Sequence, residues 1–128
     1  MKEPRAAVVV TFVASLVVGL GACDGDKRAP RVVTDGDRER GRQAVESGAC
    51  HRIPGVRSAR GIIGPSLKGL AAGPYIVGRM ANDASNLVAW IRGPRVLDPQ
   101  TIMPDLTVSE PDARDIAAFL FAGGPITR

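Results

Sequence analysis

The chain has 128 residues, which is enough for one small domain, and it carries 17 Lys and Arg against 13 Asp and Glu. The resulting net charge of +4 is too weak to indicate a nucleic-acid-binding protein, and basic and aromatic residues are not interleaved as in such proteins. No Ser-His-Asp set, clustered acid pair or phosphate-binding glycine loop stands out, so the sequence favours a carrier or binding protein over an enzyme.

Residues 1–22 have the features of an export signal. Lys2 and Arg5 precede an uncharged run from Ala6 to Leu20. That run is shorter than a comfortable bilayer span and has the length of the hydrophobic region of a signal peptide. The alternative is an N-terminal membrane helix that happens to end near a cysteine.

Small residues and a cysteine end this run, in the block Leu20-Gly21-Ala22-Cys23. The block resembles the lipobox of bacterial lipoproteins. The resemblance implies cleavage before Cys23, acylation of Cys23, and a cell-membrane lipoprotein on the periplasmic side. Residues 23–33 mix charges, Gly and Pro without apolar periodicity, which predicts a flexible tether to a domain at 34–128.

Apolar residues at helical spacing predict three helices in that domain. The expected helices run from about Asp35 to Ser47, from Ala84 to Arg92, and from Ser109 to the Gly123-Gly124-Pro125 block. The expected N-caps are Thr34 or Asp35, Asp83, and Ser109. Residues 49–78 and 96–108 are rich in Gly or Pro and predict loops, with one helical turn near Leu67 and Leu70. No segment alternates with period two, so the predicted fold class is all-α with long loops.

Aromatic residues make up only 4% of the chain. A domain of this size with so little bulky apolar material has a thin core, and long loops in so small a domain are unusual. A buried prosthetic group would supply the apolar body that such loops need.

Five blocks of residues resemble the class I mono-haem cytochrome c family, in the family's order, from about Gly41 to Phe121. They are Cys50-His51-Arg52-Ile53-Pro54-Gly55, Gly64-Pro65-Ser66-Leu67, Asn86-Leu87-Val88-Ala89-Trp90-Ile91 followed by Pro94, Ile102-Met103-Pro104-Asp105-Leu106, and Asp115-Ile116-Ala117-Ala118-Phe119-Leu120. The resemblance implies a small cytochrome c fold, with three to five helices around one haem, and close crossing of the first and last helices at Gly41 and Phe119. It also implies electron transfer with redox protein partners, such as a respiratory complex or a terminal oxidase.

His51 is the single histidine and therefore the candidate imidazole ligand of a haem iron. Met103, in the family's Met-Pro position, is the candidate sixth ligand, and Met1 and Met80 fit that role less well. The resemblance implies that the carbonyl of Pro65 accepts a hydrogen bond from the His51 ring. It also implies that Tyr75 and Trp90 reach the haem propionates, while Arg79 is either a further propionate partner or a solvated surface residue.

The chain departs from the family at the attachment motif, because Ser47-Gly48-Ala49-Cys50-His51 stands where Cys-x-x-Cys-His is expected. One interpretation is haem c held by a single thioether from Cys50. Another is that three residues are missing between Gly41 and Cys50. The runner-up function is a degenerate, haem-free lipoprotein of cytochrome fold with a structural or binding role, and a third is a haem enzyme or sensor in which Met103 leaves the iron.

Overall fold

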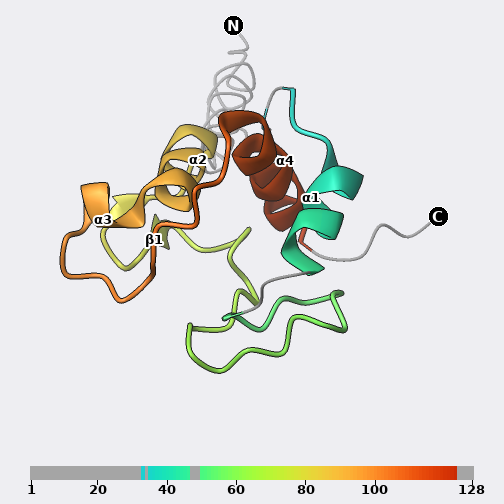
Figure 1. Ribbon diagram of the computed structural model, residues 1–128, viewed down its shortest axis with the longest axis horizontal. Coiled ribbons are helices and arrows are strands. Elements are labelled where there is room, and N and C mark those ends of the chain that lie inside the picture. Colours follow the sequence, from blue (N-terminus) through green and yellow to red (C-terminus); the bar gives the residue numbers. More distant parts are fainter. Residues whose placement is uncertain (1–32, 34, 47–49, 124–128) are drawn as a thin grey trace, which may run out of the picture.

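The computed structural model describes residues 33, 35–46 and 50–123. The elements in chain order are α1 (Arg38–Glu46), β1 (Tyr75–Ile76), β2 (Met80–Ala81), α2 (Ala84–Arg92), α3 (Pro94–Leu97) and α4 (Glu110–Phe121). Figure 1 shows α4 between α1 and α2, with the long loop after α1 below them. The predicted signal segment, the Cys23 lipobox and Ser47 lie outside the described residues, and none of the described helices is long and apolar enough to cross a membrane.

The predicted all-α fold class is wrong, because the chain also forms a small antiparallel sheet. Strands β1 and β2 pair with Tyr75 opposite Ala81 and Ile76 opposite Met80. The turn between them has positive φ angles at Val77 (47°) and Gly78 (77°), which is the backbone twist that reverses a chain between paired strands. Each strand has two residues, too few to produce the period-two alternation that predicts strands from sequence. The described chain is therefore a mixed fold of four helices and one two-stranded sheet.

Helices α2 and α4 confirm the boundaries expected from their caps. The Asp83 side chain accepts a hydrogen bond from the backbone N–H of Asn86 at 2.9 Å, and α2 runs from Ala84 to Arg92 as predicted. The Ser109 hydroxyl accepts from the backbone N–H of Asp112 at 3.3 Å at the start of α4. Each cap satisfies a donor in the first turn that has no partner within the helix.

Two local predictions were wrong. Helix α1 begins at Arg38, because Asp37 rather than Asp35 caps it: the Asp37 carboxylate accepts from the N–H groups of Glu39 and Arg40, both at 2.9 Å. Residues 96–108 were predicted to be a loop throughout, but Pro94 opens the single turn of α3, which extends to Leu97. A proline is compatible with a first helical position, since that position has no N–H to bond within the helix.

Helices α1 and α4 cross at very short range through glycine. A Cβ atom on Gly41 would lie 2.9 Å from the backbone nitrogen of Ile116 and nearer still to the carbonyl of Asp115. A Cβ atom on Gly36 would lie 2.6 Å from the carbonyl of Arg114. The close crossing expected at Gly41 is thus present. The nearest atoms of α4 belong to the backbone of Asp115, one turn before Phe119.

The core consists of two clusters, and Ile116 and Leu120 of α4 pack against both. The α2–α4 cluster contains Val33, Ile76, Leu87, Val88, Trp90, Ile91, Ala113 and Ala117. The loop cluster contains Val45, Ile53, Val56, Ala59 and Phe119. The second cluster fastens the loop after α1 onto the α1–α4 pair, and this attachment positions the site.

An ion pair reinforces the helix crossing. Asp115 is 3% exposed, and its carboxylate accepts from Nε of Arg40 at 2.6 Å, from Nη2 of Arg40 at 3.1 Å and from the backbone N–H of Asp37 at 2.6 Å. The hydrogen bonds from Arg40 hold the pKa of Asp115 below its ordinary value, with burial opposing them. A carboxyl group whose pKa is lowered by folding stabilises the folded state only while it is ionised.

We expect Asp115→Asn to lower the free energy of unfolding by about 1–3 kcal/mol at pH 7, because it removes a charge from three hydrogen bonds. The Asp115 contribution is complete above about pH 4, the ordinary pKa of an unfolded aspartate, and it is lost as the pH falls through the lower pKa of the folded state. Urea titrations at several pH values should therefore show the wild-type and Asp115→Asn curves converging in acid. Glu110→Gln, at an exposed carboxylate that pairs with Arg114, is the control and should have a smaller effect. Equal stability of Asp115→Asn and wild type at pH 7 would contradict this role.

Candidate functional site

The loop after α1 folds back so that Cys50 and His51 lie beside residues 61–65. The N–H of Gly64 donates to the carbonyl of Cys50 at 2.8 Å, and the N–H of Gly61 donates to the carbonyl of His51 at 3.2 Å. The N–H of Leu67 reaches the carbonyl of Arg52 at 2.9 Å. These backbone bonds clamp the dipeptide from both sides without using its side chains.

The His51 ring is oriented by one hydrogen bond. Nδ1 of His51 lies 2.8 Å from the carbonyl oxygen of Pro65. A carbonyl oxygen only accepts, so Nδ1 carries the proton and Nε2 of the neutral ring keeps its lone pair. This is the contact implied by the sequence resemblance, and the orientation is the one that a metal-ligating imidazole needs. The role of His51 as an iron ligand stays a prediction.

Gly64 lies against the face of the imidazole. A Cβ atom at Gly64 would be 2.5 Å from Nδ1 and 2.9 Å from Nε2 of His51, and closer still to Cε1. Only glycine leaves room for the ring in this position. Gly64 belongs to one of the blocks that resemble the cytochrome c family, but its contact with the ring was not predicted. A glycine directly before the accepting proline is the sequence signal for it.

The other predicted site residues fall into separate places. Trp90 is 7% exposed within the α2–α4 cluster, and Met103 is half-buried against the same cluster, as is Met80. Tyr75 on β1 is 59% exposed. The structure thus places Trp90 in, and Met103 against, the same cluster, and it brings His51 and Pro65 into contact.

Two further expectations concerned a cysteine and an arginine. Cys50 is a free, exposed thiol next to His51, so it is open to chemistry. Arg79, a possible propionate partner, pairs with Asp98 through Nη2 and Oδ2 at 2.8 Å, which favours the surface role.

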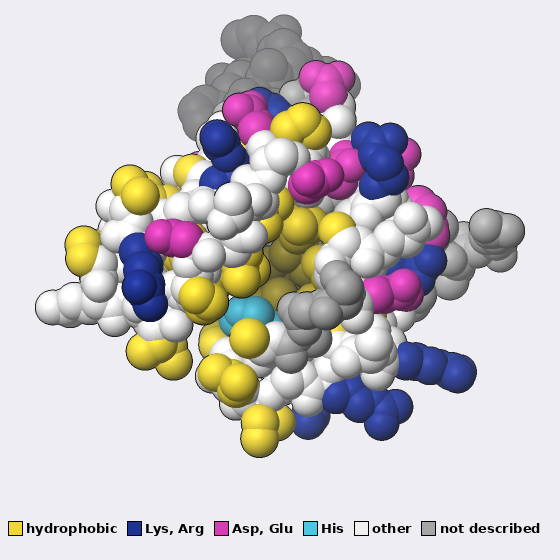
Figure 2. Space-filling view, viewed as in Figure 1, with side chains coloured by type: hydrophobic (Ala, Val, Ile, Leu, Met, Phe, Trp, Pro, Cys, Tyr) yellow, Lys and Arg dark blue, Asp and Glu magenta, His cyan; other side chains and the backbone are white. Residues whose placement is uncertain are grey.

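Apolar surface adjoins the imidazole. Figure 2 shows a hollow near the middle of this face, with hydrophobic side chains on its floor and the single histidine at its rim. Elsewhere on the same loop, a hollow of about 240 Å³ lies against α4 and is lined mainly by apolar residues that include Ile53, Leu67 and Phe119, but not by His51. Ile102 and Leu106, which flank Met103, are 81% and 54% exposed. An oriented imidazole beside uncovered apolar surface is the donor set and surface that suit haem.

The described residues do not form a binding site for a metal ion by itself. Within residues 33, 35–46 and 50–123, no group of three or more His, Cys, Asp or Glu side chains is arranged to hold one.

No family model and no solved structure matches the chain. A comparison with curated proteins finds a cytochrome c oxidase subunit 2 from Alkalihalophilus pseudofirmus (strain ATCC BAA-2126 / JCM 17055 / OF4), which is 33% identical over 84 residues. The aligned region covers 62% of this chain and 24% of that protein, so the chain spans about a quarter of the relative's length. The chain is therefore similar, over part of its length, to part of a cytochrome c oxidase subunit.

We expect Gly64→Ala to displace the His51 ring, because the added methyl group would overlap three ring atoms. The overlap should cost about 1–3 kcal/mol of stability, the usual range for overpacking. Nitrogen-15 NMR of the imidazole should show loss of the Nδ1–H form. Gly73→Ala is the matched control, since a Cβ atom there would meet its nearest neighbours at an ordinary 3.7 Å. An unchanged tautomer in Gly64→Ala would refute the contact.

Proposed function

We propose that this chain is a membrane-anchored, mono-haem c-type electron carrier of the class I cytochrome c family. One observation carries the proposal: His51 is held with Nδ1 bonded to Pro65 and Nε2 available, beside exposed apolar surface. The partial similarity to an oxidase subunit supports a role in respiratory electron transfer.

Under this proposal His51 and Met103 are the iron ligands. The Pro65 carbonyl fixes the imidazole tautomer and raises the basicity of Nε2. Met103 supplies a thioether, a soft sulfur ligand that favours the reduced iron and raises the potential. Haem, when bound, supplies the reversible one-electron change. If His51 and Met103 both held the iron, no position would be left for a substrate, which supports a carrier over an enzyme.

Cys50 is the attachment point in this proposal. Its exposed thiol is adjacent to the proximal ligand, as the second cysteine of the family's motif is. A single thioether bond to a vinyl group would prevent loss of the haem. Trp90, buried in the cluster that also contacts Met103, would then pack near the group rather than reach solvent.

The visible spectrum of the full chain, matured in a host that attaches haem c, tests the proposal. We expect a low-spin haem that remains on the protein after acid–acetone extraction, with the pyridine haemochrome α band between those of haem b and ordinary haem c. Met103→Ala should remove the sulfur-to-iron charge-transfer band, while Met80→Ala, at a methionine against the same cluster, should leave it. A protein without a haem spectrum would refute the proposal and favour the haem-free alternative.

The anchor and the partners belong to the same proposal. Acylation at Cys23 would hold the protein on the periplasmic side of the cell membrane, where a respiratory complex or terminal oxidase would exchange electrons with it. We expect fatty-acid label to enter the wild-type protein and not Cys23→Ser, whose precursor should accumulate uncleaved. Equal labelling of the two would contradict the lipobox interpretation.

A further inference from the structure

The segment from Arg52 to Arg60, which we name the arginine loop, is a fixed platform. Every third residue is buried: Ile53, Val56 and Ala59 are 7%, 5% and 1% exposed and pack into the loop cluster. The N–H of Ile53 donates to the carbonyl of Ala59 at 3.1 Å, and Arg52 pairs with Arg60 across an antiparallel bridge. The side chains between the buried residues are therefore presented outward from an ordered backbone.

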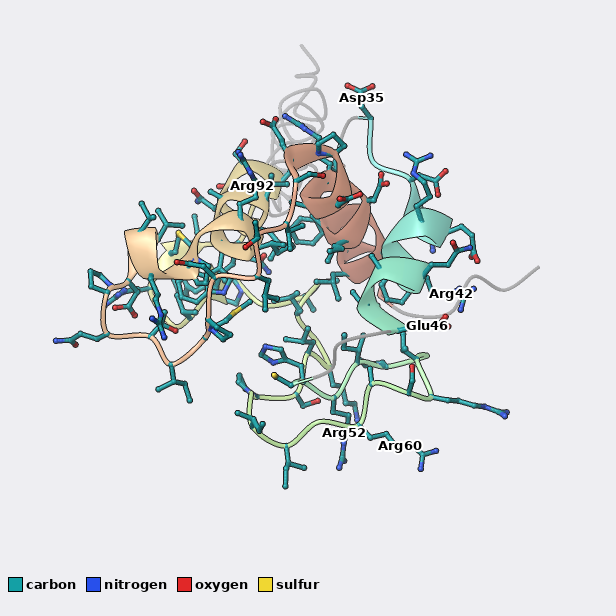
Figure 3. The ribbon with its side chains drawn as sticks, in the orientation of Figure 1. Asp35, Arg42, Glu46, Arg52, Arg60 and Arg92 are labelled. Carbon is teal, nitrogen blue, oxygen red and sulfur yellow. The ribbon has the colours of Figure 1, made fainter. Side chains whose placement is uncertain are left out.

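Three of the exposed residues are arginines that have no carboxylate partner in the part of the chain that the structure describes. Arg52, Arg57 and Arg60 form no ion pair within the described residues, and Nε of Arg60 donates instead to the carbonyl of Arg57 at 2.9 Å. Five arginines elsewhere in the described fold pair with carboxylates, namely Arg40, Arg42, Arg79, Arg92 and Arg114. Arg38 and Arg95 form no ion pair among the described residues either, but they lie singly on α1 and α3. In Figure 3, Arg52 and Arg60 lie together and point away from the helices.

The sequence directly around the loop contains no acidic residue. Residues 47–82 include four Arg and one Lys but no Asp or Glu. Placing Arg52 opposite Arg60 in a bridge is unfavourable by itself, because like charges face each other across the pair. The arginine loop therefore presents a concentrated positive charge that is available to bind an anionic partner.

The arginine loop is also hollowed and bordered by apolar side chains. All three arginines line an open hollow of about 650 Å³, together with apolar residues of the loop. Directly after the loop, Ile62 is 87% exposed and Ile63 is 73% exposed. Figure 2 shows dark blue and yellow side chains near one another along the lower edge of the molecule, where Figure 1 places this segment.

We propose that the arginine loop docks on an anionic phospholipid bilayer, with headgroup phosphates at the three arginines and Ile62 and Ile63 among the outer acyl carbons. Guanidinium groups bind phosphate through paired hydrogen bonds. A bilayer presents phosphate and hydrocarbon in adjacent layers, which matches a basic hollow next to two uncovered aliphatic side chains. An acidic protein face would match the arginines alone, and for this reason we favour the bilayer.

The test places a fluorescent reporter at the loop tip. The full chain with Ile62→Trp is reconstituted into two kinds of vesicle, both with brominated acyl chains. One contains phosphatidylcholine alone, and the other also contains phosphatidylglycerol at about 0.3 mole fraction, which gives a strong negative surface charge. We expect quenching of the new tryptophan in the anionic vesicles and little in the neutral ones. The wild-type chain, with Trp90 buried in the core, supplies the background.

Charge variants complete the experiment. Adding Arg57→Gln and Arg60→Gln to the Ile62→Trp chain should lower the ratio of docked to undocked loop by on the order of 10- to 100-fold. Each basic residue near an anionic surface contributes roughly a several-fold increase in binding, and two are removed. Arg38→Gln with Arg95→Gln removes the same charge from exposed sites on α1 and α3 and should change little. Quenching that is equal in neutral and anionic vesicles, or equally reduced by both double variants, would overturn the proposal. A tryptophan that shifts with poly-glutamate but is never quenched by lipid would assign the loop to an acidic protein instead. None of these readouts depends on haem.

Discussion

The close contact between α1 and α4 is the constraint on which the rest of the described chain depends. Gly41 lets the two backbones meet, and the carboxylate of Asp115 then reaches both the Arg40 side chain and the N–H of Asp37 at the cap of α1. One buried acid thus fixes the start of one helix against the middle of another. Helix α1 is nine residues long and mostly charged, so it has little apolar surface of its own with which to hold this position.

The contact between α1 and α4 also determines where the loop that carries His51 lies. Phe119 lies one turn beyond Asp115 on α4 and is 1% exposed, and it forms the floor of the loop cluster with Ile53 and Val56. The backbone that follows His51 is therefore seated on the helix pair. The imidazole itself is held by the loop, through Pro65 and Gly64, so its orientation does not depend on long side chains from distant elements.

The sequence predicted what local chemistry determines. Asp83 and Ser109 predict the starts of α2 and α4 correctly, because a capping side chain and the N–H that it binds are only three residues apart. The His51–Pro65 contact was available only through a family resemblance, since nothing local fixes a bond across 14 residues. The β1–β2 hairpin was not predicted, because its strands are only two residues long. Its turn also places the β-branched Val77 at positive φ, which β-branched residues rarely adopt. Asp37, rather than the predicted Asp35, caps α1, and the N–H of Asp37 also donates to Asp115, which is remote in sequence.

The separation between hydrogen-bonded partners has a consequence for the order in which the chain assembles. His51 and Pro65 are 14 residues apart, whereas Asp37 and Asp115 are 78 apart. Closing the longer segment costs about 1.5 kcal/mol more in chain entropy, and loops of the shorter size close within about a microsecond. The imidazole can therefore acquire its tautomer while the C-terminal helix is still unattached. During translation or export, residues 50–65 would form a recognisable unit before the domain closes over them.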